Sequence, residues 1–175
     1  MLDSQTRKVL KKYLCSLIFL YICFFFIYRH LSLIHESGHY LIARMYNVPV
    51  TGFRFQPEAT YIDFAEEEYL SLTITQFRML GFSGGLMELL IYFPIFYWMK
   101  NMNRPDKMHL SIIYCSVKYA LIMILIRAWF NAGIEGFFNS FYMENLPQVR
   151  LFLTLVSFIP GSILFLFNVY KENNH

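Results

Sequence analysis

Long apolar segments constrain the fold of this chain more than any other feature of its sequence. Three blocks of about 20 residues carry almost no charge; Glu88 lies inside the first and Lys118 interrupts the second. A helix needs about 20 mostly apolar residues to cross the hydrocarbon core of a bilayer. We therefore predict three transmembrane helices, over residues 79–99, 109–130 and 150–170.

The first apolar stretch is longer than one membrane crossing requires. After a polar tail over residues 1–12, an apolar run reaches Tyr28, and a helical pattern continues past Arg29. A single helix over 13–46 would be about 50 Å long, whereas the hydrocarbon core is about 30 Å thick. The helix must therefore tilt and project from the membrane, or break near Arg29. Because no proline or glycine marks a break there, we predict one long helix over 13–46.

The composition indicates the same class of protein. Hydrophobic residues make up 57% of the 175 residues and charged residues 15%, whereas soluble domains have about 45–50% and about 25%. We therefore do not expect a soluble globular domain, a disordered chain or a nucleic-acid-binding module. The net charge of +3 is too small and too scattered to favour a polyanionic partner. The three cysteines have no CxxC spacing and do not indicate a disulfide framework.

Residues 48–64 differ from the helical segments around them. β-branched and aromatic residues are interrupted there by proline and glycine, which predicts short strands joined by a turn. A solvated acidic patch, Glu66 to Glu68, follows. No repeat or low-complexity linker divides the chain. We therefore expect one membrane-embedded domain over 1–175, an all-α polytopic protein with about four transmembrane helices and a short membrane-associated β-hairpin.

A five-residue motif near the end of the long first helix carries the sharpest chemical signal. It reads His35-Glu36-Ser37-Gly38-His39, which is an HExxH pattern. Positions i and i+4 share one face of a helix, so the two imidazoles can bind one zinc ion. The glutamate can then reach a water molecule held by the zinc and act as general base.

The same motif could arise by chance, roughly once in a hundred chains of this composition. Chance would leave His35, Glu36 and His39 without a role at the end of an apolar segment. Ionisable groups at membrane depth are costly and usually mark a function. Zinc binding is therefore the favoured interpretation.

A catalytic zinc ion usually has three protein ligands and one open position, so a third ligand must come from another segment. The candidates are Glu88, Glu135, Asn131 and His109. Glu135 lies between Gly133 and Gly136, which permit an unwound stretch lining a cavity; the alternative is a helix end at the interface. For Glu88 the alternative is an ion pair with Lys118 of the neighbouring helix.

Taken in order, these residues resemble the site-2 protease family of intramembrane zinc metalloproteases. The signature helix of that family often reads HExGH followed by an alanine and a basic residue, as in His35–His39 and the following Tyr-Leu-Ile-Ala-Arg. Three further elements match in order over about residues 20–140. They are 48–64, similar to the family's membrane-associated hairpin; Gly84–Glu88, similar to its Gly-Pro-x-x-Asn element; and Asn131–Gly136, similar to its Asn…Asp-Gly element, whose aspartate is the third zinc ligand.

This sequence departs from the family pattern at two elements. Glu135 stands where the family has aspartate, at a shorter spacing from Asn131. Gly85 stands in place of the proline and Glu88 in place of the asparagine. Glutamate is a competent zinc ligand in other HExxH enzymes. Glu135 is therefore the preferred third ligand, with Glu88 and Asn131 as alternatives.

The resemblance implies zinc-dependent hydrolysis of a peptide bond in or next to a transmembrane segment of a membrane-protein substrate. His35, His39 and Glu135 would bind one Zn²⁺. Glu36 would activate water and carry the proton to the leaving amine. Asn131 would hold the substrate backbone.

Two other functions remain open: a different class of membrane HExxH peptidase, and an inactive relative that serves as a membrane adaptor. The expected partners are a transmembrane protein or peptide substrate and membrane lipid, without nucleic acid. The expected location is that of a multi-pass integral protein of the cell membrane.

Overall fold

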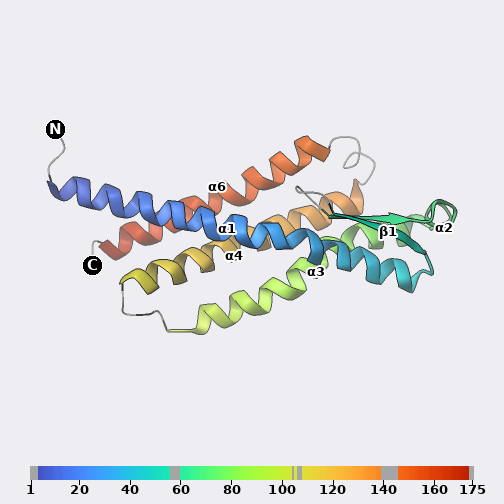
Figure 1. Ribbon diagram of the computed structural model, residues 1–175, viewed down its shortest axis with the longest axis horizontal. Coiled ribbons are helices and arrows are strands. Elements are labelled where there is room, and N and C mark those ends of the chain that lie inside the picture. The colour runs from blue at the N-terminus through green and yellow to red at the C-terminus, as the bar shows by residue number, and fades with distance from the viewer. Residues whose placement is uncertain (1–3, 56–59, 104, 106–107, 139–145, 174–175) are drawn as a thin grey trace.

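In the part of the chain that the structure describes, four long helices form an elongated bundle with a small β-hairpin at one end (Figure 1). This computed structural model describes residues 4–55, 60–103, 105, 108–138 and 146–173. In chain order the elements are α1 (Ser4–Met45), β1 (Val50–Phe55), β2 (Thr60–Phe64), α2 (Glu66–Leu70), α3 (Ile74–Asn101), α4 (Met108–Phe137) and α6 (Leu146–Asn173). Helix α4 packs against α1, α3 and α6, and α1 also packs along α3.

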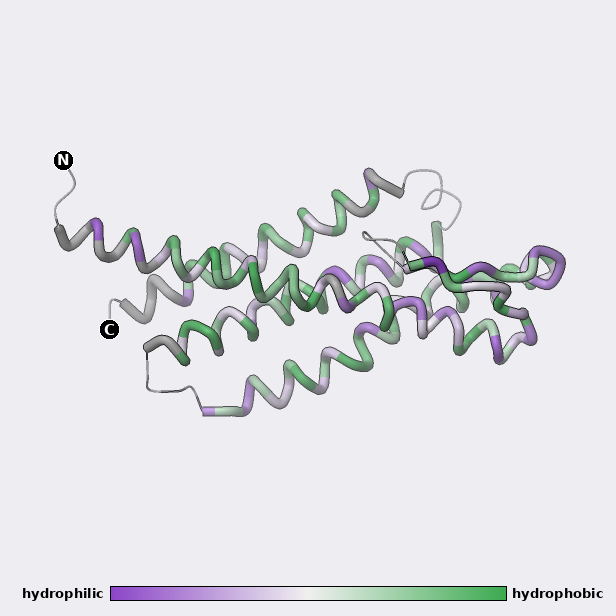
Figure 2. The backbone as a smooth tube through the Cα atoms, in the orientation of Figure 1, coloured by the Kyte–Doolittle hydropathy of each residue, from purple (hydrophilic) through white to green (hydrophobic). Residues whose placement is uncertain are grey.

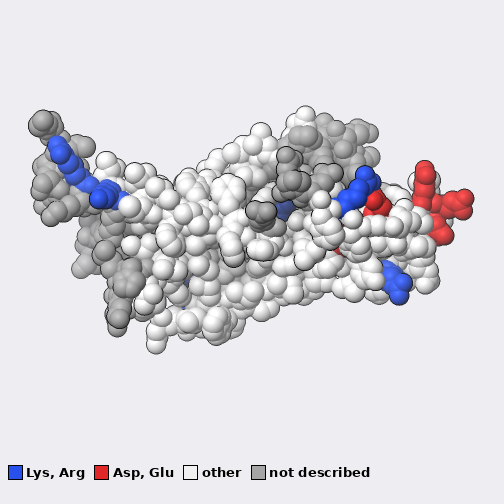
Figure 3. Space-filling model, viewed as in Figure 1, with Lys and Arg blue, Asp and Glu red and all other residues white. Residues whose placement is uncertain are grey.

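Each of the four long helices is long and apolar enough to cross a membrane. The candidate spans are Tyr13–Met45, Ile74–Asn101, Leu110–Phe137 and Leu151–Asn168. Large apolar side chains such as Phe26 and Trp98 point away from the bundle and are exposed, and apolar residues dominate the middle of the helices (Figure 2). On the face seen in Figure 3, the charged side chains gather at the two ends. The predicted fold class, an all-α polytopic membrane protein with a short β-hairpin, is confirmed.

Helix α1 is a single helix of 42 residues, about 63 Å long at 1.5 Å per residue. It continues without interruption through Arg29, as the absence of proline and glycine predicts. Helix α1 begins at Ser4 and not at the predicted residue 13, so part of the polar tail predicted over 1–12 forms its first turns. Arg7 and Lys11 are exposed there. Polar side chains are compatible with a helix that projects beyond the apolar bundle, so polarity does not mark where this helix begins.

The predicted hairpin over 48–64 is present as β1 and β2, which pair antiparallel; residues 56–59 lie outside the described part. Asn47 has a φ of 56° and ends the helical path of α1. β2 packs on α1, where the hydroxyls of Ser32 and Thr60 lie 3.4 Å apart. Across the strands, Arg54 donates from Nε to Asp63 Oδ2 at 2.7 Å, and this hydrogen bond lowers the pKa of Asp63 below its usual value.

The acidic patch after the hairpin forms the short helix α2. Its three glutamates are exposed and occupy the first turn, where the helix dipole favours negative charge. Helix α3 then begins with a capping box, in which Thr73 and Gln76 each bond the other's backbone N–H. It starts before the predicted residue 79 and continues through Pro94.

Helix α4 continues through residues 131–136 and ends at Phe137. Of the two alternatives for this segment, the structure has the helix end and not the unwound stretch. Gly136 lies against the ring of Phe82, and Gly81 of α3 lies against the backbone carbonyl of Glu135. Small residues at helix interfaces let two backbones approach closely in a membrane. At Gly136, the missing side chain therefore serves close packing of α3 against α4.

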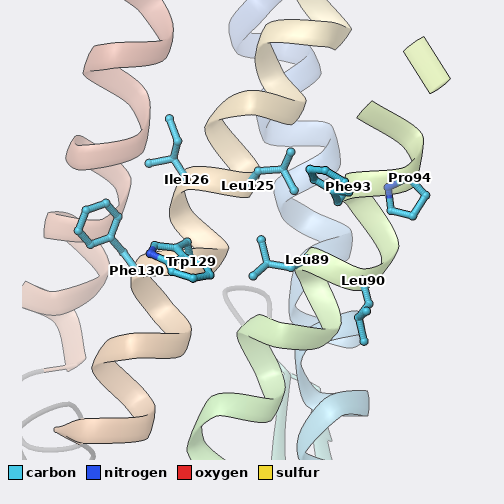
Figure 4. A pocket seen from close by; sticks show the side chains of 8 residues that line it. All are labelled: Leu89, Leu90, Phe93, Pro94, Leu125, Ile126, Trp129 and Phe130. Atoms are coloured by element: carbon cyan, nitrogen blue, oxygen red, sulfur yellow. The ribbon is translucent and has the colours of Figure 1, made fainter. Parts of the chain in front are cut away.

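An apolar groove of about 640 Å³ lies between α3 and α4 (Figure 4). Its lining consists of Leu89, Leu90, Phe93, Pro94, Leu125, Ile126, Trp129 and Phe130. These side chains offer no metal ligand and no proton acceptor. The metal-ligating and titratable side chains considered above lie elsewhere, on α1, α3 and α4.

Candidate metal centre

Two histidines near the C-terminal end of α1 bring their ring nitrogens together. His35 and His39 lie one turn apart, on a face of α1 that contacts α3. Their Nε2 atoms are 3.0 Å apart, and the ring planes are inclined at 82°. His35 is buried and His39 is half-buried. The helical spacing of the HExxH motif therefore produces the predicted pair.

The outer nitrogens of both rings face hydrogen-bond acceptors on α3. His39 Nδ1 lies 2.7 Å from the backbone carbonyl oxygen of Leu80, which can only accept, so Nδ1 carries the proton. His35 Nδ1 lies 2.9 Å from Glu88 Oε1, and an ionised carboxylate can likewise only accept. A neutral ring with its proton on Nδ1 carries its lone pair on Nε2, which is the tautomer a metal ion requires.

Glu135 of α4 completes a three-atom cluster with the two histidines. Its Oε2 atom lies 3.0 Å from His35 Nε2 and 3.6 Å from His39 Nε2. Glu135 is 5% exposed, so its carboxylate is buried beside the two histidines. Within the described residues, the one group of three His, Cys, Asp or Glu side chains that could hold a metal ion is His35, His39 and Glu135, whose ligand atoms lie within 4.8 Å of one another.

The spacing of this cluster suits a small tetrahedral cation. Zinc with bonds of about 2.1 Å separates its ligands by roughly 3.4 Å, and the three separations here are 3.0, 3.0 and 3.6 Å. Two imidazoles and one carboxylate form a donor set found in catalytic zinc sites, where a fourth position stays open. The residues present therefore fit a zinc ion.

Glycines on α1 and α3 make room for the cluster. A Cβ atom on Gly84 would meet the Nε2 atoms of both His35 and His39, and a Cβ atom on Gly38 would meet the backbone carbonyl of Ser83. Gly84 thus leaves the space that the rings occupy, and Gly38 lets the backbone of α3 pass close to α1. The element that resembles Gly-Pro-x-x-Asn forms the α3 wall of the site.

Asn131 and Glu36 flank the cluster on α4 and α1. Asn131 is 1% exposed, and its Nδ2 atom lies 3.5 Å from His35 Nδ1. Its buried Oδ1 atom accepts no hydrogen bond from the described residues. Glu36 is half-buried, directly after His35. The roles predicted for these two residues, substrate binding and general base, stay predictions.

Glu88 lies at the opposite edge of the His35 ring from Glu135. Its carboxylate faces Nδ1, whereas Glu135 faces Nε2. The geometry therefore does not support Glu88 as the third ligand. The cation in contact with Glu88 is Arg127, whose Nη1 atom donates to both carboxylate oxygens at 3.2 Å. The alternative of a Glu88–Lys118 ion pair is therefore wrong.

His109, the remaining candidate ligand, belongs to the first turn of α4, and its side chain lies outside the described part of the structure. It precedes Glu135 by 26 residues (135 − 109) on one continuous helix, which corresponds to about 39 Å. The two positions therefore lie near opposite ends of α4.

Sequence reasoning missed the contact of Arg127 with the site. An arginine inside an apolar segment is itself a signal, because such a charge needs a partner at membrane depth. Its partner is Glu88, an isolated acidic residue of the neighbouring helix α3. No protein-family model matches this chain, and neither a curated protein nor a solved structure matches it.

Proposed function

We propose that this protein is an intramembrane zinc metalloprotease that hydrolyses a peptide bond in or next to a transmembrane segment of its substrate. One observation carries the proposal. Two imidazoles and a carboxylate, drawn from helices α1 and α4, converge within a membrane-spanning bundle beside a glutamate of the HExxH motif. Three such groups at membrane depth are costly unless they serve a function.

The residues of the site divide the work of hydrolysis. Zinc bound by His35, His39 and Glu135 would polarise the peptide carbonyl and lower the pKa of a water molecule towards about 7. Glu36 accepts a proton from the attacking water and delivers it to the leaving amine. Asn131 contributes a buried Oδ1 atom that a backbone N–H of the substrate would satisfy.

The hairpin offers a way to hold the substrate in an extended form. A transmembrane substrate enters as a helix, in which the peptide N–H and C=O groups are hydrogen-bonded to one another. The helix must therefore unwind locally before a peptide bond can be attacked. β2 packs on α1, whereas Phe53, Arg54 and Phe55 of β1 are exposed. An unwound peptide can add to the outer edge of β1 through main-chain hydrogen bonds.

Metal analysis and a cleavage assay test the proposal together. The purified protein should contain about one zinc ion per chain, as expected for a mononuclear site. In lipid vesicles it should cleave single-span reporter proteins that carry glycine or proline near the end of the span. A chelator should stop cleavage, and added zinc should restore it. Glu135→Ala should lose both the metal and the activity, because two histidines alone hold zinc weakly.

Glu67→Ala is the matched control, since it removes an exposed carboxylate of α2. It should keep wild-type zinc content and cleavage. A metal-free wild-type protein would overturn the zinc site. A zinc-loaded protein that cleaves none of the reporters would overturn the protease and favour the adaptor.

A further inference from the structure

We infer that Glu88 is a positioning residue that fixes the His35 ring for metal binding, and that Arg127 holds the Glu88 carboxylate in place inside the bundle. The inference rests on the metal site of the proposed function. It gives Glu88 a role other than that of a third ligand, and it adds Arg127, which the sequence did not assign to the site. It starts from Glu88, which is 0% exposed in the middle of a membrane-spanning helix.

The two carboxylates around His35 have different tasks. Glu135 Oε2 is 3.0 Å from Nε2, on the side where His39 also points, and Glu88 Oε1 is 2.9 Å from Nδ1. A carboxylate on the far nitrogen of a metal-binding histidine fixes the tautomer and the ring orientation, and makes the near nitrogen a better donor. Glu88 has this relation to His35.

The two histidines are therefore not equivalent. Nδ1 of His39 faces a neutral backbone carbonyl, that of Leu80, which also accepts from the Ser83 hydroxyl at 2.6 Å. Among the described residues, His35 is the one of the two histidines whose Nδ1 atom faces a carboxylate. We expect His35 to be the stronger of the two imidazole donors. We therefore expect substitutions of Glu88 to alter the affinity for the metal.

Arg127 makes the buried carboxylate tolerable. Its Nη1 atom contacts both oxygens of Glu88, and its guanidinium lies 5.0 Å from the centre of the Tyr28 ring. Tyr28 belongs to α1, Arg127 to α4 and Glu88 to α3. The chain of contacts thus starts on α1, crosses α4 and α3, and returns to α1 at His35. It joins the three helices that build the site.

An ion pair could also serve packing alone, so the test must separate charge balance from metal tuning. Glu88→Gln keeps the size of the side chain and an acceptor oxygen for Nδ1 but removes the anion. It also leaves Arg127 buried without its carboxylate. The double variant Glu88→Gln/Arg127→Gln removes both charges and restores the balance. Lys118→Gln is the matched control, because it removes another half-buried cation of α4.

Zinc affinity, measured by competition with a chelator dye, and the visible spectrum of the Co²⁺-substituted protein are the readouts. Zinc affinity should fall about 10–100-fold in both Glu88→Gln and the double variant, and the cobalt bands should shift in both. Lys118→Gln should match wild type. Thermal unfolding should show that the double variant regains much of the stability lost in the single variant.

Wild-type zinc affinity and an unchanged cobalt spectrum in the double variant would overturn the inference, because the pair would then serve packing only. A wild-type protein that binds no metal would overturn the inference together with the proposed function. A wild-type protein that binds zinc but cuts no reporter would remove the protease proposal alone, since neither readout depends on cleavage.

Discussion

Replacing Glu36 by glutamine is expected to abolish peptide-bond cleavage while one zinc ion stays bound. Glutamine keeps the length of the side chain but cannot take a proton from water, so the attacking water loses its general base. General acid–base groups contribute about 10²–10⁴-fold to a rate, and we expect a loss in that range. The measurement is the initial rate of reporter cleavage in vesicles, together with the zinc content of the same preparation.

Glu68→Gln is the control for this experiment, because it makes the same change on the exposed face of α2. It should cleave at the wild-type rate. Full activity in Glu36→Gln would remove this residue from the mechanism. Loss of zinc in Glu36→Gln would show that its carboxylate supports the metal site instead.

Gly84→Ala is expected to damage the metal site more than the fold. The added methyl group would overlap with the Nε2 atoms of His35 and His39. The rings can avoid this overlap only by moving apart, which separates the two nitrogens that would bind the metal. We expect zinc affinity to fall at least about 100-fold, the upper end of losses from changes around metal ligands. The loss of stability should be about 1–3 kcal/mol, as for other overpacked sites. Zinc competition and thermal unfolding measure the two effects.

Two other glycines serve as comparisons. Gly133 has nothing within 4 Å of the position of an added Cβ, so Gly133→Ala should bind zinc normally and gain up to about 1 kcal/mol of helix stability. Gly38→Ala would press on the backbone of α3 at Ser83 and should mainly destabilise the bundle. Unchanged zinc affinity in Gly84→Ala would contradict the packing of the two rings described above.

The sequence predicted the fold where the signal was local. Three apolar blocks gave α3, α4 and α6, and the lack of a helix breaker around Arg29 gave one continuous α1. The HExxH spacing gave the facing imidazoles of His35 and His39, because helical geometry alone fixes their separation. Such features depend on neighbouring residues, and a pattern can reveal them.

Features that depend on contacts between helices were harder to predict. The glycines around Glu135 permitted an unwound backbone, but the segment is helical, and Gly136 allows the close approach of α3. Glu88 was considered with Lys118, and its cationic contact is Arg127. The sequence places all three charges in apolar helices. It does not give the relative rotation and depth of the helices, and these decide which charges meet.

The cluster lies near one end of the bundle rather than at its centre. Glu135 precedes the last residue of α4 by two positions (137 − 135), and His39 precedes the end of α1 by six (45 − 39), about 9 Å of helix. The N-terminal end of α1 and the C-terminal end of α6 lie at the opposite end (Figure 1). Under the proposed function, a substrate would be severed close to one rim of the bilayer. One product would keep nearly all of its transmembrane segment and stay in the bilayer. The other would carry only a few apolar residues and could be released into water on the side of the hairpin.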